Sequence, residues 1–349
     1  MNGCPVCTIV PPHLLQHLVR AGAGADPALR ALSDRALSTL TETERLRGRR
    51  DVLSALGHAG RVPAGTLRRA VHDAAHGESL PGKLVRSEGE PASADVAVNE
   101  AYDGAGATYG FYRDAYGRNS VDDRGERLVS TVHFGTEYDN AFWDGRQMVY
   151  GDGDGVIFNR FTIALDVIGH ELTHGVTQYE ADLAYDGQSG ALNESFSDVF
   201  GVLVKQYALG QTAEQADWLV GAGLFTPDVK GRALRSMKDP GTAYDDPRLG
   251  RDPQPAHMRD YVDAPDDNGG VHVNSGIPNR AFYLAAAALG GPAWDRAGRI
   301  WYVTLRDRLK KTASFADAAR LTADVAAELF GPQSREADAV RAAWRAVGL

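Results

Sequence analysis

This chain of 349 residues contains only two cysteines, Cys4 and Cys7, and both lie close to its N-terminus. Residues 8–349 therefore contain no cysteine, and a disulfide framework cannot stabilise the body of the protein. Long apolar runs are also missing. The longest, near residues 281–289, is too short to span a bilayer and is followed by two glycines. We therefore expect no membrane span, and we expect stability to come from a packed core.

Two further absences concern export and charge. No secretory signal is recognisable, because the N-terminus lacks a basic start and Pro5, Pro11 and Pro12 interrupt its apolar residues. Basic residues are fewer than acidic ones, with 37 Lys and Arg against 46 Asp and Glu, which gives a net charge of -9 at pH 7. This balance argues against nucleic acid as the main partner. The length suggests two or three globular domains.

The most informative stretch of the chain is His170-Glu171-Leu172-Thr173-His174. Two histidines four residues apart lie on one face of a helix, so both imidazoles can reach one metal ion. Asp166 and the apolar neighbour Val167 favour a helix here. Glu171, beside the first histidine, can take a proton from the water that attacks a substrate. The stretch therefore predicts a zinc-binding helix that also carries a general base.

A third metal ligand is expected downstream, in the segment 190–198. Catalytic zinc usually takes three protein ligands and keeps one position for water. Glu194 is the natural third ligand, after His170 and His174. Asp198 lies one turn later on the same helix face, where it can accept a hydrogen bond from the far nitrogen of a ligating histidine. Alone, these two carboxylates would be solvated helix residues, but their place after the histidine motif favours a metal site.

With these residues the sequence resembles the thermolysin family of zinc metalloendopeptidases, and within it the protealysin-like group with short propeptides. The resemblance covers about residues 69–349, and its matching stretches are 138–155, 166–198, 234–240 and 267–277. Neighbouring zinc-peptidase classes fit less well. The metzincin pattern requires a histidine where Glu180 stands, and the Gly-x-Met-Glu-Asn motif of the related aminopeptidases is absent from the sequence.

The resemblance implies an α+β fold, with a β-rich N-terminal lobe and a mainly helical C-terminal lobe joined by a central zinc-binding helix. We divide the chain into a propeptide at 1–55, the β-rich lobe ending in the zinc helix at 56–180, and the helical lobe at 181–349. Local patterns predict strands at 129–134 and 147–150, a tight turn at 151–155, and helices at 281–289, 297–309 and 315–329.

The resemblance also implies catalytic residues beyond the metal ligands. His272 and Tyr185 would donate hydrogen bonds to the transition-state oxyanion, which needs more stabilisation than a metal alone provides. Asp267 would orient the imidazole of His272. Arg235 would hold a substrate carbonyl group through its planar guanidinium.

Substrate-binding residues are carried over in the same way. Asn140 and the backbone of Ala141 would pair with an extended peptide, and Trp143 would contribute its backbone rather than its ring. The family's specificity pocket accepts a bulky apolar residue just after the cleaved bond, and its matching walls are Phe158, Phe161, Val167 and Leu234. Because Phe161 replaces a smaller aliphatic residue, we expect a tighter pocket that prefers Leu, Val or Ile to large aromatic residues.

The sequence departs from thermolysin at the paired calcium site of that enzyme. Asp166 and Asp217 match two of its carboxylates, but Lys205 stands at another matching position. The remaining positions that would need acids carry Leu219, Ala222 and, at a further calcium site, Arg232. Calcium takes about six to eight oxygen ligands, so we expect none at the paired site. Instead, Lys205 should form ion pairs with Asp166 and Asp217, and one zinc ion remains the expected cofactor.

Residues 4–15 resemble the start of protealysin-like propeptides, with their Pro-Pro-x-Leu element. This segment would lie in the cleft and inhibit the enzyme in cis, and the thiolate of Cys4 or Cys7 could occupy the open zinc position. A separate Cys-x-x-Cys site, or two reduced thiols on a tail, are the alternatives. The arginines between Arg45 and Arg50 predict an exposed, cleavable linker, with Val52 and Leu53 close to the maturation site.

Together these patterns and the resemblance predict a zinc endopeptidase that is made as a self-processing zymogen. The resemblance further implies that it is secreted and that it cleaves peptides and proteins on the N-terminal side of bulky apolar residues. Two other functions remain open: a zinc aminopeptidase, and a binding protein that holds the metal without catalysis. The missing exopeptidase motif disfavours the first. The joint presence of Glu171, Tyr185, Arg235 and His272 disfavours the second. Because secretion is implied only by the family, a cytoplasmic location is the alternative.

Overall fold

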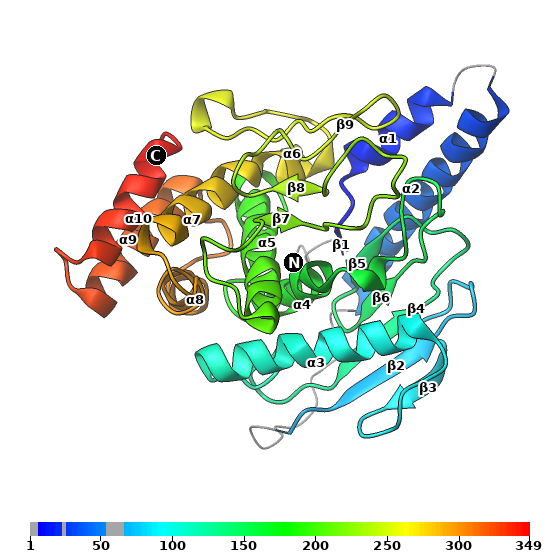
Figure 1. Ribbon diagram of the computed structural model, residues 1–349, viewed down its shortest axis with the longest axis horizontal. Coiled ribbons are helices and arrows are strands. Elements are labelled where there is room, and N and C mark those ends of the chain that lie inside the picture. Colours follow the sequence, from blue (N-terminus) through cyan, green and yellow to red (C-terminus); the bar gives the residue numbers. More distant parts are fainter. Residues whose placement is uncertain (1–5, 23–25, 54–65) are drawn as a thin grey trace.

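The structure, a computed structural model, describes residues 6–22, 26–53 and 66–349. Two lobes lie on either side of a pair of central helices, α4 and α5 (Figure 1). Over the described residues, no helix is long and apolar enough to cross a membrane. The predicted fold class is confirmed: a mixed sheet dominates the N-terminal lobe and helices dominate the C-terminal lobe.

The N-terminal lobe is built on a six-stranded mixed sheet with the strand order β1-β5-β6-β4-β2-β3. Its strands are β1 (Cys7–Thr8), β2 (Arg69–Asp73), β3 (Lys83–Ser87), β4 (Leu128–Val132), β5 (Ala141–Trp143) and β6 (Met148–Tyr150). Strands β2, β4 and β6 run parallel to one another, whereas the remaining neighbours are antiparallel. The carboxyl ends of the three parallel strands therefore meet at one edge of the sheet. β4 and β6 cover most of the two predicted strands.

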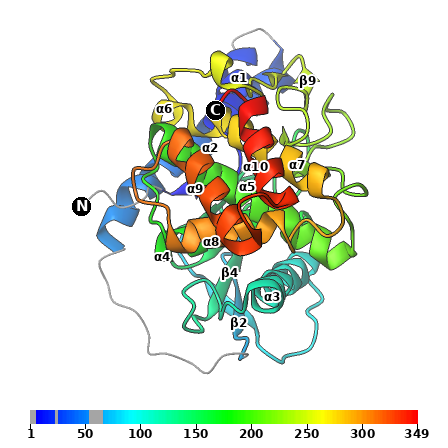
Figure 2. The same ribbon diagram turned by 90° about the vertical axis from the view of Figure 1, so that its left-hand side faces the viewer.

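Helices cover this sheet and form the second lobe. They are α3 (Val96–Tyr116), α4 (Leu165–Tyr179), α5 (Gly187–Leu209), α6 (Asp267–Asn274), α7 (Gly276–Leu289), α8 (Ala297–Asp307), α9 (Phe315–Phe330) and α10 (Arg335–Ala346). The three predicted C-terminal helices correspond to α7, α8 and α9, which gather with α10 around α5 (Figure 2). Short elements complete the lobes: the strand pairs β7 (Leu219–Val220) with β8 (Arg235–Ser236) and β9 (Asp245–Asp246) with β10 (Gly250–Arg251), and the 3-10 helices η1 (Phe161–Ile163) and η2 (Met258–Asp260).

Helix α3 was not predicted, although it is one of the longer helices of the N-terminal lobe. Asp95 caps its first turn by accepting a hydrogen bond from Ala97 N at 2.9 Å, and Gly117 ends it in the left-handed region at φ 71°. Within the helix, a Cβ at Gly104 would lie 2.3 Å from Cδ1 of Ile168 on α4. The small residue therefore allows α3 to pack closely on the helix that carries the histidine motif.

The N-terminal segment contributes strand β1 and two helices, α1 (Pro12–Ala21) and α2 (Pro27–Leu53). The arginine-rich stretch lies inside α2, so the prediction of a linker at residues 45–50 is wrong. Arg, Leu and Glu are strong helix formers, and their concentration in this stretch favours continuation of the helix. Val52 and Leu53, which mark the candidate maturation region, end α2. The site itself stays a prediction, and residues 54–65, which follow, lie outside the described part of the chain.

Candidate active site

The three predicted metal ligands converge between the two central helices. His170 and His174 project from α4, and their Nε2 atoms are 3.0 Å apart. Glu194 projects from α5, with Oε2 3.5 Å from Nε2 of His170 and Oε1 3.4 Å from Nε2 of His174. All three side chains are buried, and their ligand atoms lie within 4.8 Å of one another. The arrangement is that of three ligands around one ion.

A glycine contact brings the two helices close enough for this convergence. A Cβ at Gly201 of α5 would lie 2.3 Å from the carbonyl oxygen of Asp166 and 2.9 Å from the backbone nitrogen of His170 on α4. Real Cβ atoms do not approach backbone atoms so closely. A larger residue at position 201 would therefore push α5, and Glu194 with it, away from the histidines.

Hydrogen bonds to the far ring nitrogens orient both histidines. Nδ1 of His170 lies 2.8 Å from Oδ1 of Asp198, and Nδ1 of His174 lies 2.9 Å from Oδ1 of Asn193 and 3.1 Å from Oγ of Ser197. Because carboxylate and amide oxygens only accept hydrogen bonds, each Nδ1 carries the proton, and each Nε2 lone pair faces the other ligands. The hydrogen bond to Asp198 was predicted, whereas the contacts of Asn193 and Ser197 were not.

These residues fit a zinc ion. Oε2 of Glu194 is buried and accepts no hydrogen bond from the described residues, although its carboxylate lies within 3.5 Å of the Nε2 atoms of His170, His174 and His272. An uncompensated buried carboxylate oxygen is costly, and a cation between His170, His174 and Glu194 would supply the missing partner. Two imidazoles and one carboxylate match the ligand set of several catalytic zinc sites.

Asp198 also connects the metal site to Arg235. Arg235 donates to both carboxylate oxygens of Asp198, from Nε and from one terminal nitrogen, each at 2.8 Å, and Asn279 donates a further hydrogen bond at 2.8 Å. Burial alone would raise the pKa of Asp198, but the charge of Arg235 and the hydrogen bond from His170 lower this pKa below its usual range. Asp198 is therefore ionised, and it fixes both side chains.

His272 and Tyr185 lie on the other side of Glu194. Asp267 holds His272 through Nδ1 at 2.6 Å and through the backbone N–H at 3.0 Å. Nε2 of His272 is 3.2 Å from the hydroxyl of Tyr185, which donates a hydrogen bond to Glu194. Burial lowers the pKa of His272, but the carboxylates of Asp267 and Glu194 outweigh it and the pKa is raised. The ring is therefore a strong hydrogen-bond donor beside the metal ligands.

Glu171 is held by the edge strand of the sheet. Its Oε2 accepts a hydrogen bond of 2.9 Å from the backbone nitrogen of Trp143 in β5. The indole nitrogen of Trp143 instead donates to Gln178 at 3.2 Å. The backbone of Trp143 thus orients the candidate base, and its ring is engaged elsewhere.

Strand β1 of the N-terminal segment crosses the site as an added strand. It runs antiparallel to β5, with Cys7 opposite Trp143 and Thr8 opposite Phe142, and in Figure 1 it descends from α1 to lie between α4 and β5. The backbone N–H of Ile9 donates to the carbonyl oxygen of Ala141 at 3.1 Å. The next N–H in the chain, that of Val10, donates to Oδ1 of Asn140 at 2.9 Å.

The peptide bond between Thr8 and Ile9 is flanked by the residues that the resemblance assigns to substrate carbonyl groups. Nε2 of His272 lies 2.8 Å from the carbonyl oxygen of Thr8, and Arg235 donates to the carbonyl oxygen of Ile9 at 3.0 Å. The side chain of Ile9 is fully buried. The four predicted pocket walls, which are also buried, are Phe158, Phe161, Val167 and Leu234.

Cys7 is buried beside Tyr185 and Val271. Its sulfur is not among the ligand atoms that converge on the metal position in the described ranges. The structure therefore does not support ligation of zinc by Cys7, and Cys4 lies outside the described residues.

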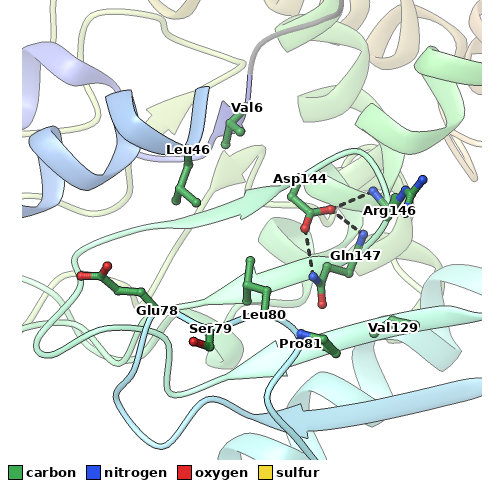
Figure 3. Close-up of a pocket in the computed structure, with 10 residues that line it drawn as sticks. All are labelled: Val6, Leu46, Glu78, Ser79, Leu80, Pro81, Val129, Asp144, Arg146 and Gln147. Carbon is green, nitrogen blue, oxygen red and sulfur yellow. Dashed lines mark hydrogen bonds between the residues drawn. The ribbon is translucent and has the colours of Figure 1, made fainter. Parts of the chain in front are cut away.

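A cavity of about 570 Å³ continues from the N-terminal end of β1 (Figure 3). Val6 and Leu46 of the N-terminal segment form one wall, and Leu80, Pro81 and Gln147 of the sheet lobe lie across from them. None of the metal ligands lines this space. It extends along the side that precedes the Thr8–Ile9 bond.

The ion pairs expected for Lys205 are present. Its Nζ lies 2.8 Å from Oδ2 of Asp166, 3.0 Å from Oδ1 of Asp217 and 2.8 Å from the carbonyl oxygen of Leu219. Burial lowers the pKa of Lys205, but the two carboxylates raise it above its usual value. A charged ammonium group therefore sits between these oxygens.

Comparisons with known proteins agree with this geometry. Two family models match the chain: "Thermolysin metallopeptidase, catalytic domain" over residues 59–178 and "Thermolysin metallopeptidase, alpha-helical domain" over residues 181–349. The "Extracellular metalloprotease" of Pectobacterium carotovorum subsp. carotovorum is 52% identical over 356 residues, covering 100% of this chain and 98% of that protein. "Protease PrtS" of Photorhabdus sp. (strain Az29) is 48% identical over 352 residues, covering 98% and 91%.

A solved structure extends the comparison to three dimensions. The precursor of protealysin, a metalloproteinase from Serratia proteamaculans, superposes with a TM-score of 0.88 at 52% sequence identity, covering 98% of this chain and 99% of that one. The similarity thus includes the N-terminal segment as well as both lobes. On the matches to both family models and to full-length relatives, this chain belongs to the thermolysin family of metallopeptidases.

Proposed function

We propose that this metalloprotease is a zinc-dependent endopeptidase, made as a zymogen, that cleaves peptides and proteins on the N-terminal side of bulky apolar residues. The observation that carries the proposal is the position of the Thr8–Ile9 peptide bond. It is held in an extended strand between His272 and Arg235, beside the convergent ligands His170, His174 and Glu194.

Each residue of the site has a distinct part in this proposal. Zinc, when bound, would lower the pKa of its water and polarise the scissile carbonyl group. Glu171, oriented by the N–H of Trp143, would accept the proton of the attacking water and later deliver it to the leaving amine. His272 and Tyr185 would donate hydrogen bonds to the developing oxyanion. Asp267 would keep the ring of His272 in position.

Main-chain pairing supports endopeptidase activity over the aminopeptidase alternative. An aminopeptidase must end its binding site at the substrate's N-terminus. Here β5 pairs with residues on both sides of the Thr8–Ile9 bond, and the cavity beyond Val6 leaves further space before that bond. The non-catalytic alternative is disfavoured because structural zinc sites close all four positions with protein ligands, whereas three ligands converge here among the residues that the structure describes.

The proposed domain division follows the same geometry. We propose residues 1–55 as the propeptide that inhibits in cis, with 56–180 and 181–349 as the two catalytic lobes. We also propose export from the cell, because the relative from Pectobacterium carotovorum is named an extracellular metalloprotease. Recovery of the protein from the culture medium of its host, free of cytoplasmic markers, would support export.

The decisive experiment is cleavage of a quenched peptide by the purified protein before and after chelation with 1,10-phenanthroline, together with metal analysis. Internal cleavage before apolar residues that chelation abolishes, and that zinc restores, would support the proposal. If the full chain binds zinc without cleaving, the assay is repeated after removal of residues 1–55. Inactivity of that zinc-loaded protein would favour the binding-protein alternative.

Specificity at the pocket provides a first prediction. We expect the enzyme to prefer Leu, Val or Ile after the cleaved bond, because Phe158 and Phe161 pack with ring centroids 5.7 Å apart in the predicted pocket wall. A Phe161→Val substitution should enlarge the pocket and raise kcat/KM for Phe relative to Leu by about tenfold, within the range that pocket methylenes contribute. Peptide-library cleavage measures both preferences.

A substitution of a second buried phenylalanine provides the control for this prediction. Phe111→Val alters a buried aromatic residue of α3 and should leave the preference unchanged. A wild-type preference for Trp after the cleaved bond would contradict the tight-pocket prediction.

We further propose that Lys205 replaces calcium at the position of the family's paired site. Selective calcium chelation, with zinc kept saturated, should then leave the melting temperature unchanged. A Lys205→Met substitution should lower the free energy of unfolding by about 3 kcal/mol, because it leaves the buried carboxylate of Asp166 without its cation. Differential scanning calorimetry measures both effects, with the exposed Lys310→Met as the control. A large drop in melting temperature on calcium removal would refute the proposal.

A further inference from the structure

A second group of possible metal ligands lies in the N-terminal lobe and shares no residue with the first. Ligand atoms of His76, His133 and Asp152 all lie within 4.8 Å of one another. Nδ1 of His133 is 2.9 Å from each carboxylate oxygen of Asp152, and Nδ1 of His76 is 3.5 Å from Oδ2 of Asp152. The ligand atoms of the catalytic group are 3.0–3.5 Å apart, so the His76–Asp152 separation lies within that range and the His133–Asp152 separations are slightly shorter.

Strand topology explains why three residues so far apart in sequence meet. His76, His133 and Asp152 follow the ends of β2, β4 and β6, the three parallel neighbours of the sheet. In sheets with parallel strands, the loops at the carboxyl ends are a favoured place for ligand binding. Two backbone hydrogen bonds join the loop after β2 to the loop after β4. His76 N donates to the carbonyl oxygen of His133 at 2.9 Å, and Gly135 N donates to the carbonyl oxygen of Gly77 at 3.1 Å.

Both histidines have a left-handed backbone conformation, which Ala75 beside His76 shares at φ 50°. His76 has φ 61° and His133 has φ 54°, in the left-handed region that non-glycine residues rarely adopt. Such conformations persist where the surrounding structure enforces them, and they concentrate at functional sites. Here they direct two imidazole rings, with centroids 5.6 Å apart, towards the same carboxylate.

Asp95 gives His133 the orientation that a metal ligand needs. Its Oδ2 lies 2.7 Å from Nε2 of His133, while its Oδ1 caps α3 through Ala97 N. With its proton held at Nε2 by this carboxylate, His133 would direct the Nδ1 lone pair at a metal ion placed between His76 and Asp152. Asp198 has the same relation to His170 in the catalytic group.

We propose that His76, His133 and Asp152 form a second zinc site, with Asp95 as its positioning residue. Two imidazoles and one carboxylate suit a borderline divalent ion such as zinc better than calcium or magnesium, which prefer all-oxygen sites. Because the His76 side chain is largely exposed, with a relative accessibility of 60%, water can complete the coordination. The ion would tie together the loops that follow β2, β4 and β6.

The same edge contacts helix α2 of the N-terminal segment. Arg45 of α2 pairs with Glu78, two residues after His76, at 2.6 Å. Arg35 pairs with Glu137, four residues after His133, at 2.5 Å. An ion that orders both loops would therefore also stabilise the surface on which α2 is docked.

The competing explanation is an ion-pair triad, in which a protonated His133 lies between Asp95 and Asp152 without a metal. This triad does not involve His76. The triad therefore leaves unexplained why the exposed His76 side chain places Nδ1 3.5 Å from Oδ2 of Asp152. Substitution of His76 therefore distinguishes the two explanations while leaving the triad intact.

The test uses the full chain carrying Glu171→Gln, which prevents self-cleavage, dialysed to equilibrium against zinc and analysed for bound metal. We expect two zinc ions per chain for this parent and one after either His76→Ala or Asp152→Asn. His72→Ala, which removes another histidine of the same lobe outside the group, should retain two. Asp95→Asn, which preserves a capping side chain, should weaken the second ion about 10- to 100-fold.

A thermal scan gives an independent readout. The second equivalent of zinc should raise the melting temperature of the parent and of the His72→Ala variant but not that of His76→Ala. One zinc per chain in the parent, or two in His76→Ala, would overturn the proposal and leave the ion-pair triad as the account of this cluster. A variant that fails to fold is identified by its far-UV circular dichroism, and the Asp95→Asn affinity then decides the question.

Discussion

A Glu171→Gln substitution should lower kcat/KM for peptide hydrolysis by about a thousandfold while leaving the catalytic zinc bound. Glutamine has nearly the size of glutamate, and its amide oxygen can still accept the hydrogen bond that Trp143 N donates to Glu171 at 2.9 Å. An amide cannot take a proton from water at neutral pH, however, so the general-base contribution of about 10²- to 10⁴-fold is lost. The measurements are quenched-peptide kinetics and metal analysis, both on protein freed of residues 1–55.

The pairing of activity with metal content makes this result specific. Glu171 is adjacent to the ligand His170 but does not belong to the ligand group, so the two readouts should separate. Glu328→Gln removes an exposed carboxylate on α9 and controls for the loss of one negative charge. It should leave kcat/KM and the zinc content unchanged. Loss of zinc together with activity would give Glu171 a structural role instead, and retained activity would require another base.

Helical spacing explains why the centre of the site could be predicted from the sequence. Residues four apart share a helix face, so the positions of His170 and His174 follow from the chain alone. Glu194 and Asp198 are related in the same way on α5. The distance between the two helices is a different matter, since it depends on the close approach at Gly201. That contact joins two helices and leaves no local periodicity in the sequence.

The partners of the ligand histidines show where local patterns stop being informative. Asn193 and Ser197 lie one residue before Glu194 and Asp198, and their contacts with His174 depend on how α5 is rotated against α4. A helical wheel could have placed them near the ligands, but it could not have distinguished them from solvated polar residues. Their roles, like those of the other site residues, stay predictions until variants are assayed.

Other features depended on long-range pairing or on competing local signals. Helix α3 is rich in small residues, which weakens the amphipathic pattern by which helices are predicted. The second cluster joins positions 76, 133 and 152, which only the parallel order of β2, β4 and β6 brings together. The arginine-rich stretch suggested a linker by its charge, whereas its helix-forming residues continue α2.

An Ile9→Asp substitution in the full chain should abolish latency, so that peptide cleavage begins without the lag expected of the zymogen. Ile9 is fully buried, its N–H donates to Ala141 O, and its carbonyl oxygen accepts from Arg235. Burying an ionised carboxylate in this apolar environment would cost several kcal/mol. The N-terminal strand should therefore leave the cleft, and the initial rate should rise at least about tenfold. Quenched-peptide cleavage, followed from the moment of zinc addition, measures the lag.

A second aliphatic-to-aspartate change separates release of the strand from the cleft from general damage to the N-terminal segment. Leu37 lies on α2 with a relative accessibility of 53%, so Leu37→Asp should leave the lag unchanged.

The Cys7→Ala variant should also stay latent, because the sulfur of Cys7 is outside the ligand group in the described ranges. An unchanged lag in Ile9→Asp would mean that β1 does not inhibit the enzyme. Loss of latency in Cys7→Ala alone would instead restore the thiolate as the inhibitory group. Backbone pairing with β5, the hydrogen bonds from Arg235 and His272, and burial of Ile9 all favour inhibition by the strand itself.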